Sequence, residues 1–217
     1  MGSEMCIRDS WSRYGPNAIL LKFADLPSDA AFARARALTA ALERNPPPGL
    51  IDYVPAFTSM LLEFASGVPD GISKLIEELE SASALELPAE PIKEISVVYN
   101  GPDLRHVAQT HGLTTMEVIE LHAVPTYKVY MLGFSPGFPY LGDLDPRLHT
   151  PRLASPRPRV AAGSVAIGGS HTGIYSVETP GGWNIIGFTE AKLFDANRER
   201  PCLLQAGDRV RFIPQRA

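Results

Sequence analysis

Glycine is concentrated in one part of this chain, because ten of its eighteen glycines lie between residues 133 and 187. Within that stretch, short apolar runs alternate with glycine and proline, and the apolar residues follow no helical period. Glycine takes positive φ angles without steric cost, so this density is typical of tight turns between many short strands. The stretch and the closing alternation of Val210 and Phe212 predict a β-barrel or a β-sandwich.

The residues before this stretch follow a different pattern, in which helices and strands alternate. A helix is predicted from Pro27 to about Asn45, and a second one begins near Pro69 with apolar residues at the i, i+3, i+4, i+7 spacing. Strands are predicted at residues 18–23, 50–54 and 57–64. The resulting order, β-α-β-β-α, is most of a ferredoxin-like split βαβ unit.

The two patterns meet near a proline-rich segment at residues 87–91, which is a predicted linker. A strand is expected at 95–99 and helices at 103–111 and 114–122, the latter opened by a capping box from Thr114 to Glu117. We therefore expect an α+β chain with a ferredoxin-like domain at residues 13–88 and a mostly β domain at residues 92–217. Residues 1–12 lack the apolar segment of a signal peptide and are predicted to be a non-native leader.

Composition excludes several classes of protein. A net charge of −4 argues against a general nucleic-acid binder, which would normally be basic. No apolar run approaches the roughly twenty residues that span a bilayer, so no membrane partner is expected. Two cysteines without paired spacing fit a reducing compartment, and we expect a cytoplasmic location.

Residues 133–137 match the G-x-S-x-G nucleophile elbow of hydrolases by letter. That elbow uses the backbone N–H of the residue after the serine, and Pro136 has none. The segment is therefore rejected as a hydrolase signature.

Residues 168–173 have the glycine spacing of a phosphate-binding Walker A loop but continue with Ile174 and Tyr175. The lysine and the hydroxyl that would contact phosphate and magnesium are both missing. A strained turn between strands is the preferred interpretation.

The five histidines offer no metal site, because none forms an H-x-x-x-H pair and none has a cysteine pair nearby. His106 and His111 are expected on a solvated helix face. His122 falls at a predicted helix end, where a cationic ring would suit the helix dipole.

Four arginines, Arg147, Arg152, Arg157 and Arg159, lie within thirteen residues, and Glu178 is the one acid between residues 147 and 188. One interpretation is solvated arginines, or arginines paired with nearby aspartates. The other is an electropositive groove for a ligand that carries a carboxylate or a phosphate, because arginine binds both through a bidentate fork.

Trp183 follows a Pro-Gly-Gly turn and has two interpretations as well. It is either an apolar wall of such a groove or a core residue, and core is the commoner place for a tryptophan.

Five sequence blocks then occur in a fixed order, and together they resemble a known family. The blocks are YxxGFSPGFPYL at 130–141, PR at 151–152, RVAAGSVAI at 159–167, TGIY at 172–175 and PGGWxIIG at 180–187. Over roughly residues 14–214, the chain closely resembles the KipI family, also called allophanate hydrolase subunit 1 or the B subunit of 5-oxoprolinase.

The resemblance implies a ferredoxin-like N-terminal domain and a cyclophilin-like β-barrel at the C-terminus. It implies one subunit, inactive by itself, of a hydrolase that opens the lactam of 5-oxo-L-proline to L-glutamate with ATP and magnesium. The implied partners are two further subunits of that enzyme, one of the KipA type (the C subunit) and one of the LamB/YcsF type (the A subunit). No catalytic residue and no resident metal are assigned.

On this basis we expect a binding site for the substrate carboxylate or for phosphate. Its expected residues are Arg152, Arg157, Arg159, His171, Thr172 and Trp183.

The sequence departs from the expected family pattern at His171, Ala161, Ser176 and Phe188. Phe188 replaces an arginine and removes a ligand contact, which favours altered substrate preference or a divergent subgroup. Two other functions stay open: an inhibitor of a sensor histidine kinase, as for the type member of the family, and a subunit related to urea carboxylase or allophanate hydrolase.

Overall fold

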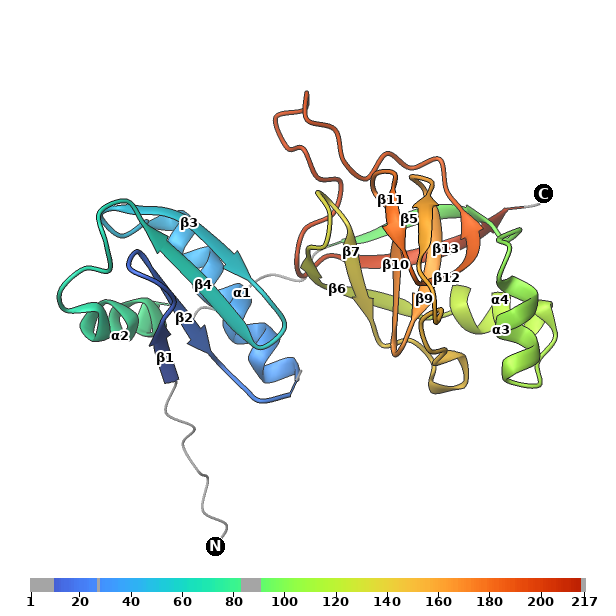
Figure 1. Cartoon of the computed structure of the whole chain (residues 1–217), viewed down its shortest axis with the longest axis horizontal. Helices are drawn as coiled ribbons and strands as arrows, with labels where there is room; N and C mark the ends of the chain where they lie inside the picture. Colours follow the sequence, from blue (N-terminus) through green and yellow to red (C-terminus); the bar gives the residue numbers. More distant parts are fainter. Residues whose placement is uncertain (1–9, 27, 83–90, 216–217) are drawn as a thin grey trace, which may run out of the picture. The chain divides into compact units, whose positions relative to one another are not determined.

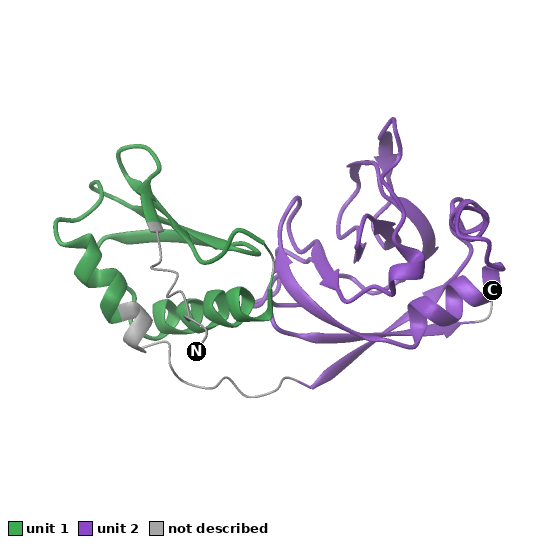
Figure 2. Ribbon diagram, turned by 90° about the horizontal axis from the view of Figure 1, so that it is seen from below, with its two compact units in different colours: residues 1–89 green, residues 90–217 purple. Residues whose placement is uncertain are grey.

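The computed structural model describes residues 10–26, 28–82 and 91–215. The chain divides into two compact units, residues 1–89 and residues 90–217 (Figure 2). Among the described residues each unit has a hydrophobic core of its own. The linker predicted at residues 87–91 lies, except for Pro91, outside the described residues.

Unit 1 is an antiparallel sheet with two helices (Figure 1). Its elements are β1 (Ser10–Arg13), β2 (Ala18–Lys22), α1 (Asp29–Arg44), β3 (Leu50–Pro55), β4 (Ser59–Phe64) and α2 (Ile72–Ala82). The strand order in the sheet is β1-β2-β4-β3. The predicted strands and the two predicted helices of this region are confirmed, with small shifts at their ends.

Helix α1 begins where a serine can cap it. The Ser28 hydroxyl accepts a hydrogen bond from the Ala31 backbone N–H at 3.1 Å, which satisfies one of the free N–H groups of the first turn. The buried face of α1 carries Ala35, Leu38 and Leu42, three and four residues apart, and these residues join those of β2 and β4 in the core.

Strand β1 is the part of unit 1 that the sequence did not predict. Residues 10–12 are expected to belong to a leader, but in the structure they pair with β2, with Trp11 opposite Leu21. After β1 the elements follow the expected β-α-β-β-α order, and β1 takes the outer place in the sheet beside β2. Residues 1–9 of the predicted leader lie outside the described residues.

Unit 2 is a closed seven-stranded β-barrel with two short helices (Figure 1). Its elements are β5 (Ile92–Val98), α3 (Leu104–Thr110), α4 (Thr115–Ala123), β6 (Thr126–Leu132), β7 (Pro139–Gly142), the 3-10 turn η1 (Pro146–Leu148), β8 (Arg157–Val160), β9 (Ser164–Gly168), β10 (His171–Ile174), β11 (Thr179–Gly181), β12 (Asn184–Phe188) and β13 (Arg209–Gln215). The barrel order is β10-β7-β6-β13-β5-β12-β9, and β8 pairs with β11 in a separate two-stranded sheet. Of the two predicted alternatives, the barrel is therefore the one that forms.

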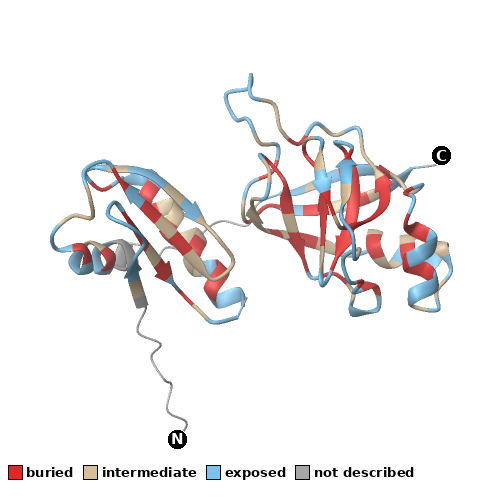
Figure 3. Cartoon of the chain, in the orientation of Figure 1, coloured by how far each residue is buried: buried red, intermediate tan, exposed pale blue. Residues whose placement is uncertain are grey.

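Three barrel strands, β9, β10 and β12, are buried on both faces (Figure 3). Val165 and Ile186 point into the barrel core, whereas their neighbours Ala166 and Ile185 belong to a second cluster. This second cluster also contains Phe138, Tyr175 and Trp183, and it lies on the outer side of the barrel wall. Burial of both faces explains why β9 and β12 contain continuous apolar runs in the sequence rather than alternating ones.

Helix α4 begins at the predicted capping box, in which the Thr114 hydroxyl and the Glu117 carboxylate each bond to the other residue's backbone N–H. At its other end the prediction for His122 is wrong. The ring is fully buried and stacks on Phe212 with a centroid distance of 4.6 Å. Burial lowers the pKa of His122 to about 3, so the ring is neutral and does not interact with the helix dipole as a cation.

No helix in the described ranges has both the length and the apolar character needed to cross a bilayer.

Candidate functional site

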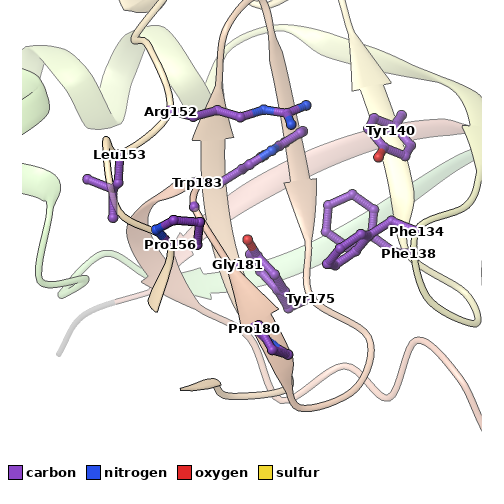
Figure 4. A pocket seen from close by; sticks show the side chains of 11 residues that line it. Phe134, Phe138, Tyr140, Arg152, Leu153, Pro156, Tyr175, Pro180, Gly181 and Trp183 are labelled. Carbon is purple, nitrogen blue, oxygen red and sulfur yellow. The ribbon is translucent and has the colours of Figure 1, made fainter. Parts of the chain in front are cut away.

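A pocket of about 330 Å³ lies in unit 2, against the outer cluster of the barrel wall (Figure 4). Its size falls in the range of small-molecule sites. It is lined by Phe134, Phe138, Tyr140, Arg152, Leu153, Pro156, Tyr175, Pro180, Gly181, Gly182 and Trp183. The lining is thus aromatic and apolar, with one formal charge.

One wall of the pocket consists of three rings packed edge to face. The Phe138 ring centroid is 5.1 Å from that of Tyr140 and 5.5 Å from that of Trp183, and Tyr140 and Trp183 are 5.8 Å apart. Such pairs are favourable beyond the area that they bury, so the wall is rigid. Trp183 is 5% exposed, and its ring therefore serves both as core and as pocket wall.

Trp183 lies directly on the backbone of β9. A Cβ atom on Gly168 would come within 2.5 Å of the Trp183 ring, so a side chain there would push the ring away. The glycine at the end of β9 is what allows the indole to lie flat on the strand.

Arg152 is the one charged residue of the lining. Its guanidinium carbon is 5.8 Å from the Trp183 ring centroid, a cation–π geometry. The backbone on both sides is anchored: the Asn184 amide donates to the Pro151 carbonyl oxygen at 2.9 Å, and the Leu153 N–H donates to the Gly182 carbonyl oxygen at 2.7 Å. Within residues 10–26, 28–82 and 91–215, no carboxylate forms an ion pair with Arg152.

Tyr175 supplies a polar group to the pocket, and its hydroxyl points toward Trp183 and Arg152 (Figure 4). Burial raises the pKa of this phenol, although the backbone N–H of Trp183 and the charges of Arg152 and Arg157 act in the opposite direction. The phenol therefore keeps its proton at neutral pH and can donate a hydrogen bond to a ligand.

The structure does not bring the four arginines together. The Arg157 guanidinium donates to the Asp103 carboxylate at 2.7 Å, and that carboxylate also accepts from the Ile185 N–H at 2.7 Å. Arg159 donates to Glu178, with its Nη2 atom at 2.7 Å, on an exposed surface. Arg147 pairs with Asp145 at 2.7 Å, which also lowers the pKa of that carboxyl to about 2. Three of the four are therefore in ion pairs, as the first of the two interpretations expected.

The other expected site residues lie beside the pocket or behind its wall. Thr172 is fully buried, where its hydroxyl contacts the His122 ring at 2.8 Å and the Ala166 carbonyl oxygen at 3.0 Å. His171 is half-buried, and its pKa is lowered by burial and by electrostatic interaction with His149 and Arg152. Neither residue lines the pocket.

The two rejected motifs are turns. Residues 133–137 join β6 to β7, which is a strand rather than the helix of a nucleophile elbow. Residues 168–173 form the β9–β10 hairpin, in which Gly169 has φ 64° and its N–H donates to the Thr150 carbonyl oxygen at 2.8 Å. That backbone group is therefore already used within the protein.

Sequence reasoning missed most of the lining. Phe134, Phe138, Tyr140 and Tyr175 all stand inside the family blocks, and this position was the signal that could have identified them. Phe188, which departs from the family pattern, packs half-buried against the outer cluster and does not line the pocket.

The pocket does not fit a nucleotide with magnesium. Its lining has no carboxylate to hold a cation and one guanidinium for a polyphosphate. Across the part of the chain that the structure describes, no three His, Cys, Asp or Glu side chains are grouped so as to hold a metal ion.

Comparison with known proteins identifies the family. Residues 10–204 match the family described as carboxyltransferase domain, subdomain C and D. A protein from Bacillus subtilis (strain 168), named as the B subunit of 5-oxoprolinase, is 39% identical over an alignment of 226 residues. The alignment covers 96% of this chain and 94% of that protein. One of the same name from Escherichia coli O157:H7 is 48% identical over 175 residues, covering 78% of this chain and 80% of that protein.

Among solved structures, that of TTHA0988 matches with a TM-score of 0.82 at 44% identity. The match covers 92% of this chain and 40% of that one, so this chain corresponds to less than half of TTHA0988. Sequence and structure therefore agree that the chain belongs to the carboxyltransferase domain family, subdomain C and D, which includes the proteins named as the B subunit of 5-oxoprolinase.

Proposed function

We propose that this chain is the B subunit of an ATP-dependent 5-oxoprolinase, which converts 5-oxo-L-proline to L-glutamate. The observation that carries the proposal is Arg152, a cation held above an aromatic wall with no carboxylate partner in the described ranges. Such a group suits a small ligand with one anionic end and a compact apolar body. The names of the relatives from Bacillus subtilis and Escherichia coli support the same reaction.

In this proposal Arg152 binds the substrate carboxylate through its planar guanidinium, and the rings of Phe138 and Trp183 exclude water from the substrate ring. Tyr175 donates a hydrogen bond to a polar atom of the substrate. Arg157 stays paired with Asp103 and Arg159 with Glu178, and neither arginine contacts the substrate.

The proposal includes a cytoplasmic complex with two partners, one of the KipA type and one of the LamB/YcsF type. Among the described residues, the pocket lining contains no Ser, Cys, His, Asp or Glu side chain that could cleave an amide. The chain by itself is therefore proposed to be inactive, and the partners to supply ATP binding and the reaction. We also assign the barrel to the cyclophilin-like type and unit 1 to the ferredoxin-like type, with β1 as its outer strand.

The test is to purify the three subunits together and to measure glutamate release from 5-oxo-L-proline with and without ATP. Arg152→Gln should reduce kcat/KM by about tenfold or more, because a charge-assisted pair to the substrate is lost. Arg159→Gln removes the same charge from a surface ion pair and should leave turnover unchanged. An intact complex without ATP-dependent release would contradict the proposal and favour the kinase-inhibitor or urea-related alternatives.

A further inference from the structure

We propose that the aromatic pocket of unit 2 binds a small ring carboxylate, and that the nucleotide of the reaction binds elsewhere. The identity of that ligand as 5-oxo-L-proline rests on the proposed function, whereas its chemical class rests on the pocket alone. The two substrates of the reaction thus bind at separate sites, and this chain holds the site for the carboxylate.

The number of available cations limits the ligand to one negative group. Arg147, Arg157 and Arg159 are in ion pairs with carboxylates of the chain, which leaves Arg152 as the charged group of the lining. A polyphosphate chain needs several cations or a magnesium ion held by carboxylates, and the lining contains neither. A single carboxylate matches a single guanidinium in charge and in planar geometry.

Backbone N–H groups, the other common means of binding phosphate, are not offered by the nearby glycine loop. The β9–β10 hairpin contains the glycines that resemble a phosphate-binding loop, but His171 is paired with Gly168 in the ladder. The N–H of Gly169, at the turn, donates to Thr150. A phosphate-binding nest requires successive N–H groups directed at the ligand, and this turn does not present them.

The walls of the pocket suit the apolar part of a ring compound. Trp183 and Phe138 offer ring surfaces at one side, and Leu153 and Pro156 offer aliphatic surface at another (Figure 4). Arg152 is itself exposed, so its contact with a carboxylate lies at the solvent side of the pocket, while the apolar walls cover the rest of the ring. The Tyr175 hydroxyl provides a donor for one polar atom of the ring, such as a lactam oxygen.

The inference is tested on the full chain by isothermal titration calorimetry with four probes: 5-oxo-L-proline, 2-pyrrolidone, inorganic phosphate and ATP. We expect saturable binding of 5-oxo-L-proline. Pyrrolidone, which has the lactam ring but no carboxylate, should bind at least about tenfold more weakly, as expected for the loss of a charge-assisted hydrogen bond. Phosphate and ATP should neither bind at the pocket nor compete with 5-oxo-L-proline.

Arg152→Gln should weaken binding of 5-oxo-L-proline at least about tenfold and leave the weak binding of pyrrolidone unchanged. Arg159→Gln is the matched control and should bind like the unmodified chain. Trp183 fluorescence, recorded in a Trp11→Phe background, locates the binding event at the pocket wall, because Trp11 and Trp183 are the two tryptophans of the chain.

Competition by ATP or phosphate, equal binding of pyrrolidone, or no saturable binding of any probe would overturn the inference. Binding of 5-oxo-L-proline by the chain combined with an inactive complex of the three subunits would refute the proposed function and leave this inference standing. An active complex in which Arg152→Gln changes neither the binding of 5-oxo-L-proline nor its KM would support the proposed function and refute this inference.

Discussion

His122 connects helix α4 to the barrel through a directional chain of hydrogen bonds. Thr172 donates its hydroxyl hydrogen to the Ala166 carbonyl oxygen, so its oxygen accepts from His122 Nε2–H at 2.8 Å. The other ring nitrogen, Nδ1, accepts from the Tyr99 hydroxyl at 2.7 Å. This arrangement satisfies every polar atom of a neutral ring, and a second proton on Nδ1 would face a hydroxyl that must then turn away.

The buried ring makes stability dependent on pH. Because the folded pKa of His122 is about 3 and the unfolded pKa is near 6.5, the unfolded chain binds more protons between these values. Stability is therefore complete above about pH 6.5 and falls as the pH decreases toward 3, by up to about 1.4 kcal/mol per unit. Urea unfolding at pH 7 and pH 5 should show this loss, and His122→Gln should reduce it. Equal losses in both proteins would contradict the assignment.

Phe134 combines an unusual backbone with an exposed ring at the rim of the pocket. Its φ is 67°, a left-handed conformation that is unfavourable for an aromatic residue, and its side chain is 60% exposed. The ring packs edge to face with Phe138 at 5.4 Å and with Tyr175 at 6.2 Å. Since neither strain nor exposure stabilises the fold, the ring is expected to serve the ligand.

Substitution of Phe134 by asparagine separates the strained backbone from the role of the ring, because asparagine tolerates positive φ. Phe134→Asn should change the free energy of unfolding by less than about 1 kcal/mol and weaken binding of the ring carboxylate several-fold. Asp143, with φ 66°, is the matched control outside the pocket lining, and Asp143→Asn should leave binding unchanged. Large destabilisation by Phe134→Asn in urea unfolding would instead assign the ring to the core.

At the scale of elements, the pocket exists because a glycine at the end of one strand lies under a side chain of another. Strands β9 and β12 pair directly, with Ile167 opposite Asn184, and this register places Trp183 over Gly168. The wall is thus formed by strand pairing rather than by a flexible loop, which fixes the position of the indole.

Gly168→Ala should therefore disrupt the wall. The added methyl group would lie within 2.5 Å of the indole, so the ring must move, with an expected loss of about 1–3 kcal/mol from overpacking and a loss of ligand binding. Gly182→Ala is the control for stability, since the nearest atom to its Cβ is 3.7 Å away. Thermal unfolding should distinguish the two variants, and equal melting temperatures would show that Trp183 moves without cost.

At the scale of the whole molecule, the two units have cores that share no residue among those described. Each unit also contains one of the two tryptophans, Trp11 in β1 and Trp183 beside β12. The fluorescence of each tryptophan therefore reports on the unfolding of its own unit.

Core truncations should act on one unit at a time. Leu62→Ala in unit 1 and Leu141→Ala in unit 2 each remove a side chain with 0% exposure, and each should destabilise its own unit by about 2–5 kcal/mol. The expected result in single-tryptophan variants is a shift of the Trp11 transition by the first and of the Trp183 transition by the second. A joint shift in both cases would show that the units unfold as one.

The sequence by itself determined the family and most elements of secondary structure. Helix caps, apolar spacing and glycine turns act over a few neighbouring residues, which is why Ser28, the Thr114–Glu117 box and the turns between residues 133 and 187 could be interpreted directly. Strand β1 was missed because the first residues resemble a leader, and its pairing depends on β2.

Only the tertiary structure decided which arginine is available to a ligand. Arg157 is neutralised by Asp103, which is 54 positions away, and Arg159 by Glu178, which is 19 positions away. The same holds for His122, whose burial results from contact with Thr172, fifty positions along the chain. Charge pairing and desolvation depend on distances in space, and these distances are set when the barrel closes, so no local pattern could single out Arg152 as the arginine of the four without a carboxylate partner among the described residues.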